Sequence, residues 1–197
     1  MIPENGYLVE SDPNYGYPNP GDRRKVLLWS KRPWQEVDKV GSECLPRGRF
    51  VTGITHGIRF VGVCIPWRDA HVRTGRKDRV LWQDHLQFLE AFTPLADVYR
   101  SAGIQVCITG DFNQRIPRSR QPLEVAQRLA DTFGADWKIV TAGIYDNEGH
   151  LLIDHVATCG PLIAHVDKII PKKLSDGLPL SDHVGIVTTI TSTAVNN

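Results

Sequence analysis

Two short polar motifs combine residue types that can handle water, protons or a cation. Gly110-Asp111-Phe112-Asn113 follows an apolar run, and Ser181-Asp182-His183 precedes another. Asp111 and Asn113 are two residues apart, so they point the same way in an extended chain. A carboxylate beside an amide can orient a water molecule and stabilise a phosphoryl oxygen. The alternative for the first motif is an Asx turn, and for the second a capped turn before a strand.

A third polar position, Asp154, lies inside the apolar run Ile153-Asp154-His155-Val156. Burying a carboxylate is costly unless another group pairs with it. We expect His183 to be that partner, because an imidazole titrates near neutrality and a carboxylate on its ring N–H fixes its tautomer. Asp182 would then be free to serve as an oxygen ligand for a cation.

Chance matches do not account well for the two motifs together. A Gly-Asp-x-Asn match is expected in roughly one chain in thirty of this length, and Ser-Asp-His is about as rare. Both occur here, each at the end of a predicted strand. Their joint occurrence favours one shared site.

The elements that must position these side chains alternate between strands and helices. Apolar residues at three- and four-residue steps predict a helix over residues 79–99, and Pro122 favours a second over residues 122–133. His56-Gly57 predicts a hairpin between two β-rich runs. Strands are predicted over residues 25–29, 49–55, 58–65, 104–109, 137–140, 150–157, 162–169 and 184–191. This order predicts an α/β (α+β) fold with mixed or antiparallel sheets in a single domain spanning residues 1–197.

The composition excludes few functions, and it is that of an ordinary globular protein. The 197 residues are 41% hydrophobic and carry a formal net charge of +1, so no strong global charge demands nucleic acid. No apolar run approaches the roughly 20 residues that span a bilayer, and the start of the chain does not have the pattern of a signal peptide. The four cysteines are scattered, which argues against a zinc site or a disulfide framework. We expect a cytoplasmic protein without a membrane partner.

The three polar clusters resemble the C-terminal motifs of the endonuclease/exonuclease/phosphatase superfamily, over residues 26–190. The resemblance implies a four-layer sandwich, with two packed β-sheets between helices, and hydrolysis of phosphoesters assisted by Mg²⁺ or Mn²⁺. By matching motif, Asp111 and Asn113 would position the nucleophile and the scissile phosphate. His183 would contact the phosphate or act as acid or base, Asp154 would orient it, and Asp182 would help to hold the metal.

Two departures from the pattern of the superfamily bear on activity. Its members begin with a strand ending in Asn and a later strand ending in a Glu metal ligand, and neither has a counterpart here. The chain therefore resembles a member without its first strand–helix–strand portion, which predicts weak catalysis and a partner chain or dimer that covers the missing edge. At the strand end where many members carry His or Tyr, this chain has Cys64 or Pro66. We expect His71, in the following loop, to reach in instead.

Basic residues close to these motifs suggest the substrate. The residues that we expect to bind it are Arg68, His71, Arg115 and Trp67. Arginines could follow a phosphate backbone, and Trp67 could stack on a base, although a solvated loop and a cap on the sheet are the simpler alternatives. We therefore expect a metal-dependent phosphodiesterase, most readily a nuclease that attacks with an activated water. A small-molecule or lipid phosphatase and a non-catalytic binding module are the alternatives.

Overall fold

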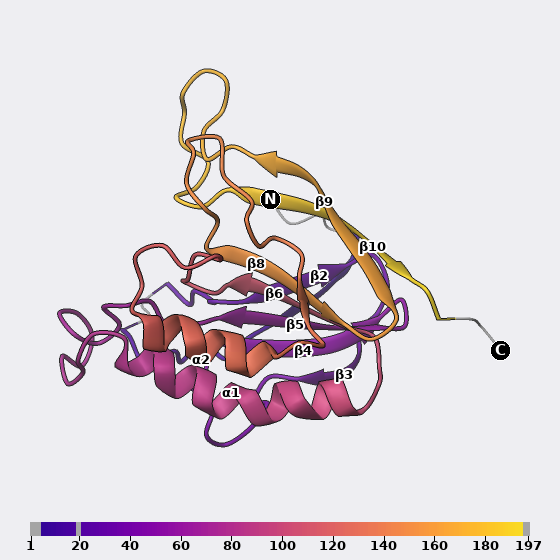
Figure 1. The fold of residues 1–197 in the computed structure, drawn as a ribbon, viewed down its shortest axis with the longest axis horizontal. Helices are drawn as coiled ribbons and strands as arrows, with labels where there is room; N and C mark the ends of the chain where they lie inside the picture. The colour runs from indigo at the N-terminus through magenta and orange to yellow at the C-terminus, as the bar shows by residue number, and fades with distance from the viewer. Residues whose placement is uncertain (1–4, 19–20, 195–197) are drawn as a thin grey trace.

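A computed structural model describes residues 5–18 and 21–194, and its largest element is a six-stranded mixed sheet (Figure 1). The strand order is β3-β4-β5-β6-β8-β7, and only β5 and β6 pair in parallel. The strands are β3 (Gln35–Asp38), β4 (Phe50–Thr55), β5 (Ile58–Cys64), β6 (Val106–Asp111), β7 (Lys138–Ile139) and β8 (Asp154–Cys159). Because β5 and β6 run in parallel, their carboxyl ends meet at one edge of the molecule.

The hairpin between β4 and β5 shows how local sequence sets this sheet. His56 and Gly57 both have positive φ, 53° and 74°, which is the backbone geometry of the tight turns that match strand twist. The turn aligns Thr55 with Ile58. The predicted hairpin is therefore present at the predicted residues.

Alternation along β5 shows that both faces of the large sheet are covered. Val61 and Val63 pack into the main core with the helices, whereas Phe60 and Cys64 pack into apolar clusters on the opposite face. Side chains of a strand point alternately to its two sides. Both sides of this sheet are thus buried, as a sandwich requires.

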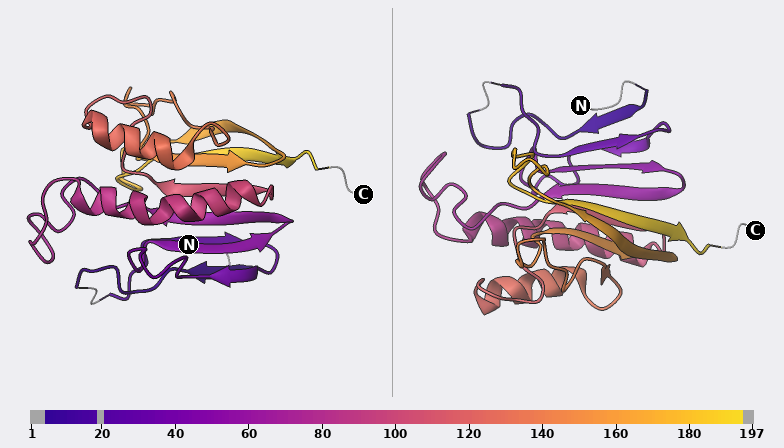
Figure 2. Two further views of the ribbon diagram at one scale, coloured as in Figure 1. Left: turned by 60° about the horizontal axis from the view of Figure 1, so that its bottom comes forward. Right: turned by 90° about the horizontal axis from the view of Figure 1, so that it is seen from above.

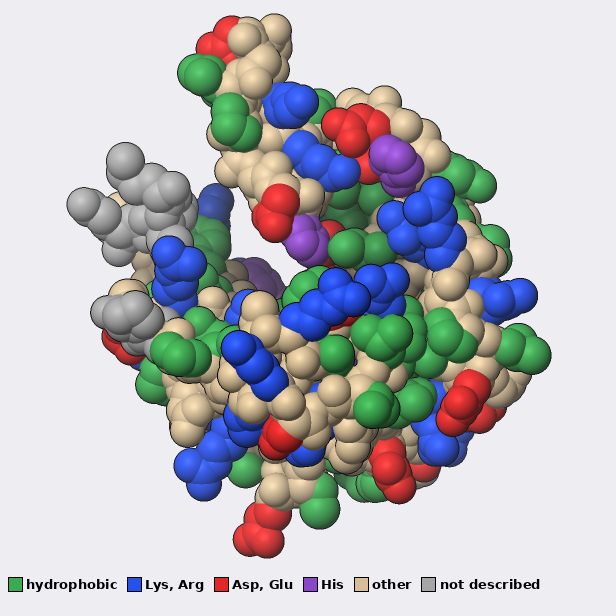
Figure 3. All heavy atoms as spheres, turned by 90° about the vertical axis from the view of Figure 1, so that its left-hand side faces the viewer, with side chains coloured by type: hydrophobic (Ala, Val, Ile, Leu, Met, Phe, Trp, Pro, Cys, Tyr) green, Lys and Arg blue, Asp and Glu red, His purple; other side chains and the backbone are tan. Residues whose placement is uncertain are grey.

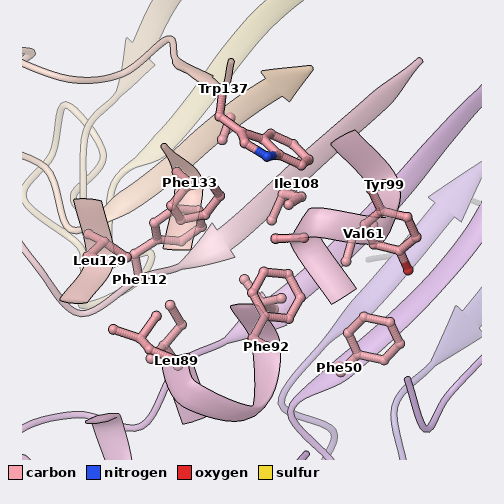
Figure 4. Close-up of a cluster of buried hydrophobic side chains, with 14 of the residues drawn as sticks. Phe50, Val61, Leu89, Phe92, Tyr99, Ile108, Phe112, Leu129, Phe133 and Trp137 are labelled. Carbon is pink, nitrogen blue, oxygen red and sulfur yellow. The ribbon is translucent and has the colours of Figure 1, made fainter. Parts of the chain in front are cut away.

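Two helices cover one face, and their aromatic residues form the centre of the main core (Figure 4). These helices are α1 (Gln83–Ser101) and α2 (Leu123–Phe133). Phe133 of α2 stacks on Phe112, with ring centroids 5.4 Å apart. Phe112 is fully buried, so the residue between Asp111 and Asn113 anchors that motif to the core.

Two antiparallel hairpins cover the opposite face (Figure 2). One pairs β1 (Tyr7–Glu10) with β2 (Leu27–Ser30), and the other pairs β9 (Leu162–Ile170) with β10 (Gly185–Ser192). The predicted sandwich of sheets is confirmed, and its second sheet layer consists here of two separate hairpins. Among the described residues, both helices lie on the other side of the large sheet.

Several predicted boundaries differ from the structure. The first helix begins at Gln83 rather than at residue 79, because Trp82 has a positive φ of 67°. The strand predicted from residue 150 begins at Asp154, since residues 146–153 form a turn-rich segment in which Asp146 accepts backbone hydrogen bonds. Strands β1 and β3 were not predicted. No helix in the described part of the chain is long and apolar enough to cross a membrane.

Candidate active site

Asp111 and Asn113 lie where β6 ends, and the backbone there fixes their relation. The Asp111 carboxylate accepts hydrogen bonds from the Asn113 backbone N–H at 2.9 Å and from its side-chain amide at 2.7 Å. Asn113 has a φ of 52° and also donates to the Ile65 carbonyl at the end of β5. The Asx turn is therefore present, and it also holds the Asp111 and Asn113 side chains together; their functional role remains a prediction.

Gly110 is required immediately before Asp111. Its φ is 139°, and a Cβ atom at this position would lie 1.9 Å from the Val63 carbonyl oxygen on the neighbouring strand β5. No side chain fits in that space, and L residues avoid this backbone region. The glycine of the motif thus allows β5 and β6 to pair closely up to their last residues, which lie at the same edge of the sheet.

Asp154 and His183 form a hydrogen-bonded pair. Asp154 begins β8 and is the direct cross-strand neighbour of Asp111, while His183 lies just before β10. The imidazole Nδ1 is 2.7 Å from the Asp154 carboxylate. The expected contact between these residues is present, and their catalytic roles remain predictions.

The pair changes the proton affinity of the imidazole. The hydrogen bond to Asp154 raises the pKa of His183 to about 9, against an opposing effect of partial burial. Without a bound cation the ring is therefore protonated at neutral pH. Its Nε2 has no hydrogen-bond partner among the described residues, so this N–H is available to an anionic ligand.

Asp111 has an elevated pKa for a different reason. Burial is the main cause and the negative charge of Asp154 adds to it, so that the pKa of Asp111 rises to about 6. At pH 7 the carboxylate is still ionised, yet it is basic enough to accept a proton from a water molecule. Burial and a like charge thus raise the proton affinity of the Asp111 carboxylate.

Asp111, Asn113 and His183 line a cavity of about 490 Å³ at the edge where β5 and β6 end. Figure 3 shows this face hollowed, with Lys and Arg side chains gathered around the hollow. The same cavity is lined by acidic groups and by the basic side chains of Lys25 and Arg49. The full lining is Tyr15, Tyr17, Pro18, Lys25, Arg49, Cys64, Trp67, Thr74, Asp111, Asn113, Asp182 and His183.

The donor set in this cavity fits a hard divalent cation. Asp111 and Asp182 contribute carboxylates to its lining. Asp154, the cross-strand neighbour of Asp111, forms with Asp111 and His183 a group whose ligand atoms lie within 4.8 Å of one another. The Asn113 side-chain oxygen accepts no hydrogen bond within the described ranges. Carboxylate and amide oxygens are the ligands that Mg²⁺ and Mn²⁺ prefer.

The structure separates the four predicted substrate-binding residues. Trp67 lines the cavity and is half exposed. Arg68 lies outside the lining and pairs with Asp69 at 2.7 Å. Arg115 lines a neighbouring hollow on the other side of His183, together with Asp146 and Lys172. Proximity in sequence to Asn113 was therefore a poor guide for Arg115, because the chain turns away from the cavity after the motif.

His71 does not line this cavity. Its ring is buried and stacks on Tyr17, with centroids 4.2 Å apart, and it lines a neighbouring cavity instead; its role in substrate binding stays a prediction. Of the two residues considered for the position that carries His or Tyr in the superfamily, Cys64 is the last residue of β5 and lines the cavity, whereas Pro66 does not line it. The Arg49 guanidinium donates to the Cys64 carbonyl at 3.2 Å.

Sequence reasoning missed Tyr15, Tyr17, Lys25 and Arg49. The loop of residues 12–22 gave no signal beyond its prolines and glycines. Arg49 did give one, because an arginine directly before the apolar run Phe50-Val51 enters a buried strand, and a buried guanidinium needs an anionic or polar partner.

A buried polar chain supports the Asn113 turn from behind. The Gln114 side-chain amide contacts His85 Nε2 at 2.8 Å, and the Gln114 carbonyl accepts from His155 Nε2 at 2.9 Å. His85 contacts the Pro66 carbonyl at 2.7 Å. Burial lowers the pKa of His85 to about 4, so its ring is neutral at neutral pH. The network ties α1, β8 and the loop after β5 to the residue that follows Asn113.

Comparisons with known proteins bear on the fold. No family model and no curated protein matches the chain. Solved structures do: an AP endonuclease from Archaeoglobus fulgidus is 16% identical with a TM-score of 0.69, and covers 96% of this chain and 80% of its own. The 3′ phosphatase NExo from Neisseria, bound to product DNA hairpin, is 17% identical with a TM-score of 0.64, over 93% and 78% of the two chains.

A third similar structure is an endonuclease/exonuclease/phosphatase family protein from Leptotrichia buccalis. It is 14% identical, with a TM-score of 0.51, over 94% of this chain and 71% of its own. The chain therefore has the fold of the endonuclease/exonuclease/phosphatase superfamily, as its motifs predicted. At these identities the likeness establishes the fold, and function has to be argued from the cavity.

Proposed function

We propose that the chain is a phosphodiesterase, most readily a nuclease, that uses a divalent cation and a water molecule to cleave its substrate. The observation that carries the proposal is the grouping of Asp111, Asp154 and His183, whose ligand atoms lie within 4.8 Å of one another. Asp111 and His183 of this group line a cavity together with Lys25 and Arg49. Acidic groups suit a cation and a water molecule, and basic groups suit a phosphate. The similar structures include proteins named as AP endonuclease and 3′ phosphatase.

Each side chain has a distinct role in this proposal. Asp111 orients the attacking water and accepts its proton, because its pKa of about 6 suits a base at neutral pH. Asn113 donates both of its side-chain N–H groups, to Asp111 and to Ile65, so it holds Asp111 in place and leaves its side-chain oxygen to accept a hydrogen bond from the attacking water. Protonated His183 binds the phosphate and donates a proton to the leaving oxygen, and Asp154 keeps that imidazole in place.

Asp182 would help to hold the cation, Mg²⁺ or Mn²⁺. The bound cation would supply positive charge against the phosphoryl oxygens in the transition state. We expect weak affinity, because the Asp154 carboxylate already pairs with His183 and no Glu lines the cavity within the described residues. Titration calorimetry with Mn²⁺ should give a dissociation constant in the millimolar range, and tight stoichiometric binding would contradict this part of the proposal.

Cleavage assays test the proposed activity. Plasmid, single-stranded and abasic DNA are incubated with and without Mg²⁺, for the wild type, Asp111→Asn and His183→Ala. We expect Mg²⁺-dependent cleavage that falls by about 10²-fold or more in both variants. His165→Ala, which changes a histidine that is 64% exposed in its side chain, is the matched control and should keep full activity. Equal rates in all four proteins would place any activity elsewhere.

Binding without hydrolysis is the second candidate function. It is favoured by the absence of a Glu from the described lining of the cavity, since the resemblance assigns the main metal ligand to that residue type. In this case DNA would bind with a steep salt dependence, and no cleavage would appear with any cation. The same assays therefore decide between the two candidates.

A further inference from the structure

A second cavity, of about 240 Å³, opens beside the first. Tyr15 and Arg49 belong to the lining of both cavities. The two cavities therefore adjoin each other at these two residues. The basic side chains that line the second cavity are Arg47, Arg49, Arg76, Arg79 and His71.

The charge of this second cavity is not balanced by its own acidic groups. Asp84 is the one carboxylate in its described lining, and Arg79 pairs with it at 2.7 Å. Arg76 pairs at 3.3 Å with Asp78, which lies outside the lining. Arg47 and Arg49 have no carboxylate within 4 Å in residues 5–18 and 21–194. Positive charge is therefore left over, and an anion would neutralise it.

Arg49 is the side chain that most needs such an anion. It is 5% exposed, and its guanidinium donates to the Cys64 carbonyl at 3.2 Å, with the Cys64 sulfur at 3.8 Å. A guanidinium carries five N–H donors and is costly to bury without an opposing charge. Two neutral partners leave both the charge and several donors available, and the planar fork of arginine matches phosphate oxygens.

The loop that supplies Arg76 is held in place before any ligand arrives. The Arg76 backbone N–H donates to His71 Nδ1 at 3.1 Å, and the His71 backbone N–H donates to the Tyr17 hydroxyl at 2.8 Å. The rings of His71 and Tyr17 stack. Arg76 is thus attached to the wall of the first cavity, and a preformed site loses less entropy on binding than a mobile one.

We propose that the second cavity binds a second phosphate group of the substrate. This group would lie next to the phosphate that Asp111 and His183 act on in the first cavity. This inference rests on the proposed function and narrows it to phosphodiesters with a neighbouring phosphate. That phosphate is either a terminal group or the next linkage of a nucleic acid strand. The terminal phosphate and the phosphate of the next linkage present the same anionic oxygens to the cavity. The ligands chosen for the test distinguish between them.

Binding is measured by titration calorimetry without hydrolysis, using thymidine 5′-phosphate, thymidine 3′,5′-bisphosphate and the 5′-phosphorylated dinucleotide pTpT. We expect the bisphosphate to bind about tenfold more tightly than the monophosphate, since one charge-assisted contact contributes that much. Arg47→Ala and Arg76→Ala should abolish this preference. Arg73→Ala changes an arginine of the same loop that lines neither cavity, and should retain the preference.

Equal affinity for the monophosphate and the bisphosphate would overturn the inference. Loss of the bisphosphate preference in Arg73→Ala as well would also overturn it, because it would indicate nonspecific electrostatic attraction. A preference that pTpT shares with the bisphosphate assigns the cavity to the next linkage of a strand, and one confined to the bisphosphate assigns it to a terminal phosphate. Release of p-nitrophenol from the 5′-p-nitrophenyl esters of the same ligands tests the proposed hydrolysis separately. If no p-nitrophenol is released but the preference for the bisphosphate is intact, the proposed hydrolysis is contradicted and the inference about the second cavity stands.

Discussion

His183 shows how one hydrogen bond can set the chemistry of a site. Its contact with Asp154 is the largest cause of a pKa raised to about 9. The imidazole is therefore protonated at neutral pH, and in the proposed mechanism it donates a proton while Asp111 accepts one. The two roles follow from two environments, a charged partner for His183 and burial for Asp111.

The first prediction concerns this histidine. In cation-free protein, Asp154→Asn should lower the pKa of His183 by about one unit or more, because it removes the opposite charge. Nitrogen-detected NMR titration of the His183 imidazole measures the change against the wild type. An unchanged His183 pKa would show that the pair does not control its protonation.

The same shift has a consequence for stability. The pKa of His183 is higher in the folded protein than the ordinary value of 6.5, so its contribution is fully present below pH 6.5. That contribution is lost as the pH rises through about 9. Wild-type protein should therefore lose stability between pH 7 and 10 relative to Asp154→Asn, measured by urea denaturation.

Strands β5 and β6 position the site by ending together. Their parallel pairing places Cys64 opposite Asp111, and Asn113 links the two strand ends by donating to Ile65. Across β6, the antiparallel strand β8 brings Asp154 beside Asp111. The site is therefore built by the register of three neighbouring strands, with His183 added from the segment before β10.

Gly110→Ala tests the closeness of these strands. A methyl group 1.9 Å from the Val63 carbonyl oxygen must push β5 and β6 apart, and we expect a loss of more than about 3 kcal/mol in the free energy of unfolding. Gly149→Ala is the matched control, because Gly149 also has a positive φ but open space around its Cβ position. It should cost about 1 kcal/mol. Similar losses for both variants would show that strain alone, and not the strand contact, matters at Gly110.

Prediction from sequence succeeded where short-range pattern decides the structure. The hairpin at His56-Gly57 and the second helix followed from turn and helix signals, and the Asp154–His183 contact followed from the cost of a carboxylate in an apolar strand. The residues around the cavity were harder. Whether Arg115 or Arg49 faces the cavity depends on the path of loops and on strand register, which a local pattern does not encode.

At the scale of the whole molecule, the large sheet separates a helical layer from two hairpins (Figures 1 and 2). Each hairpin carries exposed apolar residues, among them Leu27 on β2 and Val187 on β10. Exposed apolar side chains on a sheet layer are favourable places for another chain to pack. A partner chain or dimer on these hairpins stays a prediction, as does the weak metal affinity.

The central claim is that this cavity hydrolyses phosphodiesters with a divalent cation. The most direct measurement is the rate of p-nitrophenol release from thymidine 5′-p-nitrophenyl phosphate at increasing Mg²⁺ concentration, for wild type, Asp111→Asn and Asp136→Asn. Asp136 is largely exposed and lies outside the cavity. We predict a rate that rises with Mg²⁺ in the wild type and in Asp136→Asn, and falls by about 10²-fold or more in Asp111→Asn. A rate that is independent of Mg²⁺, or equal in all three proteins, would contradict the account.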